Sequence, residues 1–398
     1  MICNWAARAD GVGDGGAVRR DLHSQRQDPV LSRRDPGPGY GRACPGCGAV
    51  TEGELPAHVR ARAGFGPETC AQAANLVSGH HIPVYRATVL LCQLAGITVS
   101  TGWMAGIRGK AAALAEASGF MDRVRELLKT APAVHADETP ARAAAGTRYV
   151  HLACTRYLTH MHTGDRSAEA IDAGQVLPGY QGIIVRDGYA GYGHLTSALH
   201  AWCGVHLLRD LKGLYDFEPA QQGWASAMAA LLIEARDAAA AARLAGQAAL
   251  GAAVLNDLVT RYRALAAEGL TANLYRRTTT AKDARRLARR FRTFEDLILR
   301  FATGPDLDIF SNNEAERTIR PVKVQQRSSG GSWRTLEGLA EFALVHSYLS
   351  TAAKWASANS TPSATSSVAI PGSRPPSNLP DNTPTPATRH LTPLTLGE

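Results

Sequence analysis

Alternating apolar and polar positions in the middle of the chain predict a set of short β-strands. An apolar run at residues 131–136 ends at Asp137, and stretches rich in β-forming residues follow at 148–155 and 157–162. A hairpin at Arg156 would join the last two stretches. We therefore expect three strands in a row, the first of which delivers an acidic side chain at its end.

A helix and a fourth strand are predicted next. Residues 165–173 have helical character, and either Asp165 or Ser167 is suited to cap that helix. Residues 182–185 have the apolar composition of a buried strand whose carboxyl end lies next to Asp187. The order strand, strand, strand, helix, strand predicts an α/β fold with a mixed sheet, laid out like a ribonuclease-H-like core. Ligands gather at the carboxyl ends of strands in such sheets, so the two aspartates could lie side by side.

The region before these strands, residues 65–128, is helical in pattern. It resembles two helices joined at Gly96, the second capped by Ser100 or Thr101. Helix-turn-helix geometry would place three side chains on or near a DNA duplex: Trp103, Arg108 and Lys110. An ordinary helical hairpin packed on the rest of the protein explains the same pattern.

A long helical stretch, residues 207–300, separates the strands from the later motifs and predicts an inserted all-α subdomain. Its most basic segment repeats arginines with i, i+4 spacing, with Asp283 as the opposing charge: Arg285, Arg286, Arg289 and Arg290. Four guanidinium groups on one helix face could neutralise successive DNA phosphates. The alternative is a solvated face paired with acids elsewhere in the chain.

Composition narrows the class of protein. The chain has 398 residues, 45% of them hydrophobic, and a formal net charge of +8, which favours an acidic partner but also fits a solvated basic surface. No apolar run reaches the roughly 18 residues of a membrane helix, and the start lacks a signal-peptide core, so we expect a cytoplasmic protein without membrane contact. Residues 1–41 and the Ser-, Thr- and Pro-rich tail 356–398 are expected to be disordered.

Seven cysteines dispersed along the chain favour thiols or a metal site over a disulfide framework. Cys44 and Cys47, in segment 42–64, form half of a zinc knuckle, but a second pair is absent and Cys70 is isolated. Farther on, Cys203 and His206 have the spacing of a metal-ligand pair. Zinc is one interpretation of these residues, and a packed cysteine beside a hydrogen-bonded histidine is the other.

Three acidic residues in distinctive settings indicate a two-metal phosphoryl-transfer site: Asp137, Asp187 and Glu316. Cations that activate a water or hydroxyl and hold the leaving oxygen of a phosphodiester need hard carboxylate ligands from separate segments. Each acid alone could instead be a turn or helix cap. For Glu316 the alternative is specific, because with Asn313 as cap it would complete a capping box and could pair with Arg320. Pro321 is expected to end or kink this helix.

The chain resembles the IS66 family of bacterial insertion-sequence transposases, which have an Asp-Asp-Glu site. The resemblance rests on motifs in the family's order: HADETP at 135–140, RDGY at 186–189, AWCGVH at 201–206, DLD at 306–308, NNEAER at 312–317, GGSWRT at 330–335 and SYLSTA at 347–352. It covers the chain from about Phe65 to Trp355. The family pattern maps its catalytic glutamate onto Glu316 and leaves Glu314 at a variable place.

The resemblance implies a ribonuclease-H-like core at 129–206 and 301–355 and a transposase that cuts insertion-sequence ends and joins the 3′-hydroxyls to target DNA. Asp137, Asp187 and Glu316 would bind magnesium or manganese. Synapsis of two DNA ends implies a homo-oligomer at the nucleoid, and accessory proteins of the element are further expected partners. In the family, helical sequence continues past Lys354 and Trp355 and a longer amino-terminal module is present.

Two other functions remain open from the sequence. One is a DNA-binding protein without catalysis, either a decayed transposase or a regulator that uses the helix-turn-helix-like segment. The other is a ribonuclease-H-like nuclease that never transfers strands.

Overall fold

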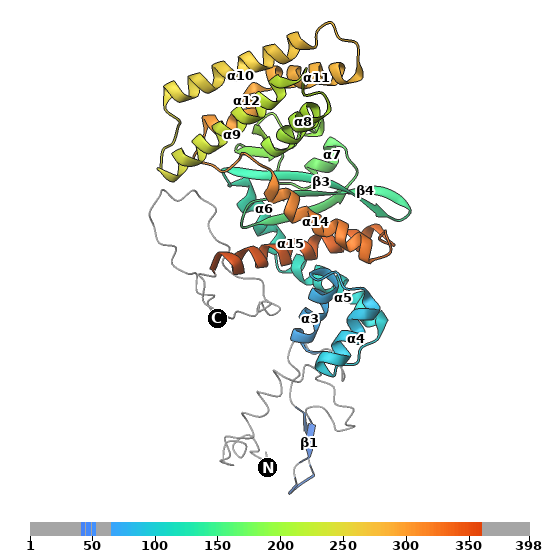
Figure 1. The fold of residues 1–398 in the computed structure, drawn as a ribbon. Coiled ribbons are helices and arrows are strands. Elements are labelled where there is room, and N and C mark those ends of the chain that lie inside the picture. Colours follow the sequence, from blue (N-terminus) through green and yellow to red (C-terminus); the bar gives the residue numbers. More distant parts are fainter. Residues whose placement is uncertain (1–40, 44, 49, 53–64, 360–398) are drawn as a thin grey trace. The chain divides into compact units, whose positions relative to one another are not determined.

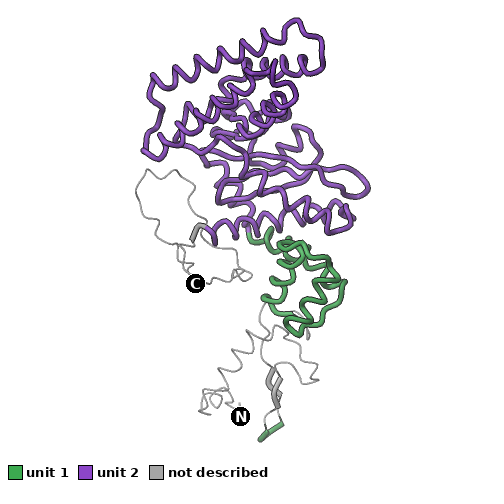
Figure 2. Tube along the Cα trace, in the orientation of Figure 1, with its two compact units in different colours: residues 1–118, 366–376 green, residues 119–365, 377–398 purple. Residues whose placement is uncertain are grey.

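The computed structural model describes residues 41–43, 45–48, 50–52 and 65–359. The segments expected to be disordered lie almost wholly outside these residues, as does Cys44. The exceptions are residue 41, which begins a strand, and residues 356–359, which are helical. The chain divides between Ser118 and Gly119 into two compact units, which Figure 2 distinguishes by colour.

The first unit contains a short strand pair and three helices. Strands β1 (Gly41–Ala43) and β2 (Val50–Glu52) pair antiparallel. The helices are α3 (Pro67–Ser78), α4 (Val84–Ala95) and α5 (Thr101–Ala117). As expected, α4 ends at Gly96, whose φ of 67° is the left-handed conformation that glycine adopts without strain. Ser100 caps α5 by accepting a hydrogen bond from the backbone N–H of Trp103.

The second unit is built on a five-stranded mixed sheet in the order β5-β4-β3-β6-β7. The strands are β3 (Ala133–Ala143), β4 (Gly146–Cys154), β5 (Thr159–Gly164), β6 (Ile183–Arg186) and β7 (Leu199–Trp202). Strands β3, β4 and β5 are antiparallel neighbours, whereas β6 is parallel to both β3 and β7. The predicted helix between β5 and β6 is shorter than expected. It is α7 (Ala168–Asp172), and Ser167 is its cap.

The first strand does not end at Asp137, as the sequence suggested, because β3 pairs with β4 as far as Ala143. Its pairing with β6, however, stops at His135. Beyond that point one side of β3 has no neighbouring strand, so Pro140 fits there without removing a sheet hydrogen bond. Asp137 therefore lies just past the point where β3 and β6 separate.

Helices cover both faces of the sheet (Figure 1). On one face lie α14 (Asn313–Ser328), which runs through Pro321 instead of ending there, and α15 (Leu336–Asn359). On the other face lie α6 (Phe120–Lys129), α7 and the 3₁₀ helix η1 (Ala190–His194). Helix α15 also covers the edge strand β5, because Ser347 and Thr351 accept hydrogen bonds from its backbone N–H groups.

A helical cluster follows β7 in the chain (Figure 1). It comprises α8 (Gly204–Phe217), α9 (Gly223–Leu244), α10 (Ala252–Ala272), α11 (Thr279–Thr293), α12 (Glu295–Ile298) and α13 (Arg300–Thr303). These helices share one apolar core, centred on Trp224, Tyr262 and Phe291, that reaches Val185 and Trp202 of the sheet. The helical cluster thus packs against strands β6 and β7 of the sheet.

Candidate functional site

Strand β3 presents the first candidate acid toward helix α14. Side chains alternate along a strand, so His135 and Asp137 share one face and Glu138 lies on the other. His135 Nδ1 is 3.2 Å from Asn312 Oδ1, just before α14. The face of β3 that carries His135 and Asp137 is therefore the one turned toward α14. Asp137 is largely buried, and its Oδ1 accepts a hydrogen bond of 2.9 Å from the N–H of Glu138.

The second acid follows β6 directly, in a tight turn. Asp187 Oδ1 accepts a hydrogen bond of 2.8 Å from the N–H of Tyr189. The buried guanidinium group of Arg186 donates to the carbonyl oxygens of both Asp187 and Tyr189, each at 2.9 Å, and its Nε donates to His200 on β7. These bonds fix the backbone around Asp187 at the carboxyl end of the parallel strands.

Asn312 holds the amino-terminal turn of α14 against the sheet. Its buried side chain donates to the carbonyl oxygen of Ala136 at 2.8 Å, so it is occupied with β3. Asn312 is the residue before the helix, but its side chain caps no helix N–H group, and Asn313 already lies inside the helix. The capping box considered from the sequence is therefore absent from this helix start.

The two glutamates of this turn have different neighbours. Glu314 pairs with Lys354 of α15, with 2.9 Å between Nζ and Oε1, and lies 3.7 Å from Arg317. Glu316 lies 3.5 Å from His206 of α8, measured between Oε1 and Nδ1. Two residues apart on a helix, they point roughly 200° apart. Glu314 is thus paired with cationic side chains, while Glu316 lies beside His206.

Electrostatics connect the three acids. Burial raises the pKa of Asp137 to about 7, and the negative charges of Glu138, Asp187 and Glu316 act in the same direction, whereas the hydrogen bond from the Glu138 N–H lowers it. The strand register places Asp137 and Asp187 each two residues past the last β3–β6 pair, His135 and Val185. The Asn312 side chain ties the start of the helix that carries Glu316 to β3.

Glu138 is a charged neighbour of this group that the sequence did not single out. Its side chain is only 2% exposed. It accepts from Arg166 at 2.7 Å and from the Tyr192 hydroxyl at 2.8 Å. Arg166 in turn lies over the ring of Tyr189, 3.9 Å from its centre. The alternation of side chains along β3 predicts that Glu138 lies on the face opposite Asp137. Its partners, Arg166 and Tyr192, come from other segments, so the sequence around Glu138 does not indicate them.

Cys203 and His206 lie beside Glu316. Cys203 is buried directly before α8, and its Sγ accepts a hydrogen bond of 3.1 Å from the N–H of Asn312. One ligand atom from each of Cys203, His206 and Glu316 lies within 4.8 Å of the other two. Cys203 and the charge of Glu316 raise the pKa of His206, against the opposing effect of burial. Cys47, by contrast, is exposed in the first unit.

Some of the basic residues predicted to contact DNA are held by contacts within the protein, and others are exposed. Arg108 donates to Ser78 and to the carbonyl oxygen of Val77, both at 3.3 Å, and Trp103 packs against Phe65. These contacts pack α5 against α3 and against Phe65, which precedes α3. Lys110 is exposed.

The four arginines of α11 do not form one free face. Arg285 donates to the backbone carbonyl oxygens of Asn273, Leu274 and Arg276, so it stabilises the end of α10. Arg290 pairs with Asp210 of α8 at 2.8 Å. Arg286 lies 3.0 Å from Asp283 but is largely exposed, and Arg289 is exposed. Only the last two present their charge mainly to solvent.

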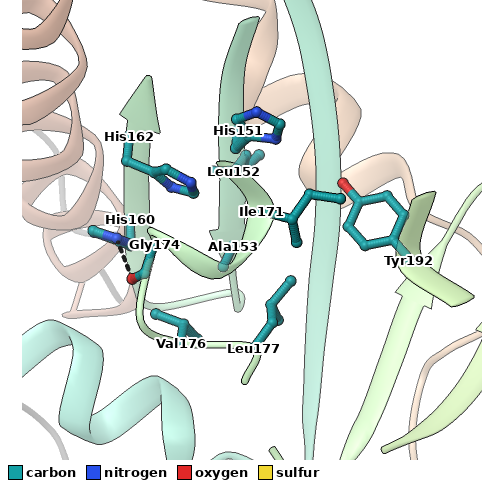
Figure 3. A pocket seen from close by; sticks show the side chains of 10 residues that line it. All are labelled: His151, Leu152, Ala153, His160, His162, Ile171, Gly174, Val176, Leu177 and Tyr192. Carbon is teal, nitrogen blue, oxygen red and sulfur yellow. Dashed lines mark hydrogen bonds between the residues drawn. The ribbon is translucent and has the colours of Figure 1, made fainter. Parts of the chain in front are cut away.

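A small cavity on the other face of the sheet contains three histidines (Figure 3). Its volume of about 10 Å³ is close to the space of one water molecule, so it is too small for a substrate. His151 of β4 stacks on His162 of β5, and His162 also stacks on His160, two residues earlier in β5. We assign it no part in the candidate site.

Comparison with known proteins identifies the family of the chain. The family model described as "Transposase IS66 family", a family of Asp-Asp-Glu transposases, matches residues 62–340. The chain therefore belongs to the IS66 family of transposases, and this membership implies a role in DNA transposition. No curated protein matches the sequence significantly. Within the described residues, no helix has both the length and the apolar character needed to cross a membrane.

Proposed function

We propose that this protein is a metal-dependent transposase that cuts the ends of its insertion sequence and joins the freed 3′-hydroxyls to target DNA. The observation that carries the proposal is the register of the parallel strands β3 and β6: His135 pairs with Val185, so Asp137 and Asp187 each follow this last pair by two residues. The strand order, with Asp137 on the first core strand and Asp187 directly after the fourth, supports a ribonuclease-H-like core at 129–206 and 301–355. Residues 207–300 are its inserted helical subdomain.

The chemistry of the three acidic side chains suits a divalent cation. Hard carboxylate oxygens from separate segments are the ligands that magnesium and manganese prefer, and Asp137, Asp187 and Glu316 would supply them. When bound, the metal would activate the attacking water or hydroxyl and stabilise the leaving oxygen. Asp137 must lose its proton to bind a cation, and its pKa near 7 places this step close to neutral pH.

The surrounding residues position these ligands. Arg186 fixes the turn that carries Asp187, and Asn312 ties the start of α14 to β3 beside Asp137. Arg166 binds Glu138, so the neighbouring carboxylate remains on the other face of the strand. DNA would be contacted by exposed basic residues such as Lys110, Arg286 and Arg289. Synapsis of two ends would require a homo-oligomer, and accessory proteins of the element are further proposed partners.

Strand joining by the full chain tests the proposal. Sequencing the DNA on either side of the gene gives the terminal inverted repeats, and a labelled duplex with one such end is incubated with a plasmid and Mg²⁺. We expect joining by the wild type, and loss of joining with retained DNA binding in Asp187→Asn. Asp172→Asn, which changes an exposed carboxylate of α7, serves as the matched control.

Other results would favour the other functions. DNA binding without cleavage, unaffected by Mg²⁺ and by Asp187→Asn, would indicate a binding protein. Metal-dependent cutting without joining would indicate a nuclease. Joining by Asp187→Asn at the wild-type rate would contradict the assignment of the acids.

A further inference from the structure

The cluster of Cys203, His206 and Glu316 is assembled by a close backbone approach. The N–H of Gly204 donates to the carbonyl oxygen of Phe310 at 2.7 Å, and a side chain at Gly204 would meet the Phe310 ring at 2.5 Å. Glycine is therefore needed for the start of α8 to lie against the segment that leads into α14. This contact places the Asn312 N–H at the Cys203 sulfur and brings His206 to Glu316.

Two buried polar atoms in this cluster have partners only inside it. His206 Nδ1 and Glu316 Oε1 are inaccessible to solvent and lie 3.5 Å apart, and the other partner of the His206 ring is the Cys203 side chain. Almost all buried polar atoms are hydrogen-bonded, so such a pair requires an explanation, and a bound ion is one.

The spacing of the three groups fits a transition metal. In a tetrahedral zinc site with bonds of about 2.0–2.3 Å, ligand atoms lie roughly 3.3–3.8 Å apart. The His206–Glu316 distance of 3.5 Å already falls in that range, and the whole group lies within 4.8 Å, so small side-chain movements would complete it. A sulfur, an imidazole nitrogen and one carboxylate favour zinc over magnesium. The Asn312 N–H is placed to stabilise a thiolate at Cys203.

We propose that Cys203, His206 and Glu316 form a zinc site that shares Glu316 with the magnesium site of the proposed function. Zinc held there keeps the Glu316 carboxylate on the α8 side and so weakens binding of magnesium or manganese by Asp137 and Asp187. The thiol proton of Cys203 is released when zinc binds. The site thus makes DNA cutting sensitive to zinc. The sharing of Glu316 rests on the proposed function, whereas the zinc site itself does not.

Cobalt(II) is the probe for the site, because a cobalt–thiolate bond gives an intense ultraviolet absorption band that zinc abolishes on competition. We expect the full chain to show this band, and Cys203→Ser and His206→Gln to weaken cobalt affinity at least tenfold. Cys47→Ser is the matched control, since it removes an exposed thiol far along the chain. A full band in Cys203→Ser and His206→Gln would overturn the site, as would its loss in Cys47→Ser alone.

Manganese binding tests the sharing of Glu316 without depending on activity. Free Mn²⁺ is followed by electron paramagnetic resonance while one equivalent of zinc is added. We expect zinc to weaken manganese affinity at least tenfold in the wild type and to have no such effect in His206→Gln. Equal manganese affinity with and without zinc would contradict sharing. Failure of the wild type to bind manganese at all would count against the proposed function and the sharing, while the cobalt result would still decide the zinc site.

Discussion

Asp137 is a buried carboxyl group among other negative charges, and these surroundings determine its protonation. Its pKa is raised to about 7 from the ordinary value of 3.8, chiefly by burial. A carboxyl group whose folded pKa exceeds its unfolded pKa destabilises the fold as pH rises between the two values. In the metal-free protein this cost begins near pH 4 and is complete above pH 7.

We therefore expect Asp137→Asn to stabilise the metal-free protein, more at pH 8 than at pH 5. The amide keeps the oxygen that accepts from Glu138 and removes the buried charge. The gain at pH 8 should be on the order of 2–4 kcal/mol. Urea unfolding with a chelator present measures it, and Asp216→Asn, which changes an exposed carboxylate of α8 paired with Lys212, should show no such gain. An equal effect of Asp137→Asn at both pH values would contradict the assigned pKa.

Single residues also show where sequence reasoning stops. Motif context selected Asp137, Asp187 and Glu316, and the strand register places the two aspartates each two residues past the last pair of β3 and β6. Glu138 was missed because its partners, Arg166 and Tyr192, come from separate segments. For the same reason the sequence could not show that the Arg285 side chain is occupied by backbone carbonyl groups.

Among the structural elements, the hairpin between β3 and β4 gave no signal in the sequence. Its two turn residues, Ala144 and Ala145, have φ values of 48° and 61°. Two-residue turns of this type usually contain asparagine or glycine, and alanine is uncommon in this conformation. The other hairpin, at Arg156, was predicted because polar residues interrupt two β-rich runs. The local pattern was thus sufficient to predict that these strands form. It could not predict where β3 ends, because that depends on the pairing of β3 with β4.

The β4–β5 hairpin carries a buried histidine stack that should make the protein sensitive to acid. The Nε2 atoms of His151, His160 and His162 bind backbone carbonyl groups, so these nitrogens carry the proton. Burial lowers the pKa of His160 to about 3 and of His162 to about 4, from 6.5. Below pH 6.5 the unfolded chain takes up protons that the folded hairpin does not. The free energy of unfolding therefore decreases as the pH is lowered.

Between pH 6.5 and 5, each of these histidines should cost at most about 1.4 kcal/mol per pH unit. We expect His160→Gln to flatten the dependence of unfolding free energy on pH in this range, whatever its effect on absolute stability. His194→Gln should act in the opposite direction. Although burial lowers the pKa of His194, hydrogen bonds to Asp172 and Gly191 raise it overall. An unchanged slope in His160→Gln would contradict this account of the hairpin.

At the scale of the whole molecule, the overall charge of +8 is less informative than where free charge lies. Of the basic residues on α11, Arg285 and Arg290 are held by groups of neighbouring helices, while Arg286 and Arg289 face solvent. The sequence located this helix but could not tell bound from exposed arginines, because their partners on α8 and α10 are distant in the chain.

We expect the double variant Arg286→Ala with Arg289→Ala to bind DNA more weakly, independent of sequence. Each lost phosphate contact lowers the slope of log affinity against log salt by about 0.9, so the slope should fall by up to about 1.8. The matched control is Arg261→Ala with Arg263→Ala, which removes equal charge from α10 where carboxylates already bind both groups. Fluorescence anisotropy over a salt series measures the slopes. Equal slopes for the two double variants would mean that α11 does not contact DNA.

The choice between Glu316 and Glu314 tests the central claim most directly, because only one of them can complete the proposed metal site. The measurement is the rate of Mg²⁺-dependent cleavage and joining of labelled ends under single-turnover conditions, together with the thermal midpoint of each variant. Glu316→Gln should lose about 10²-fold or more in rate with little change in midpoint, since the helix start depends on Asn312. Glu314→Gln should keep its activity and lose its ion pairs with Lys354 and Arg317. A Glu316→Gln protein that still joins ends, beside a Glu314→Gln protein that does not, would contradict the account.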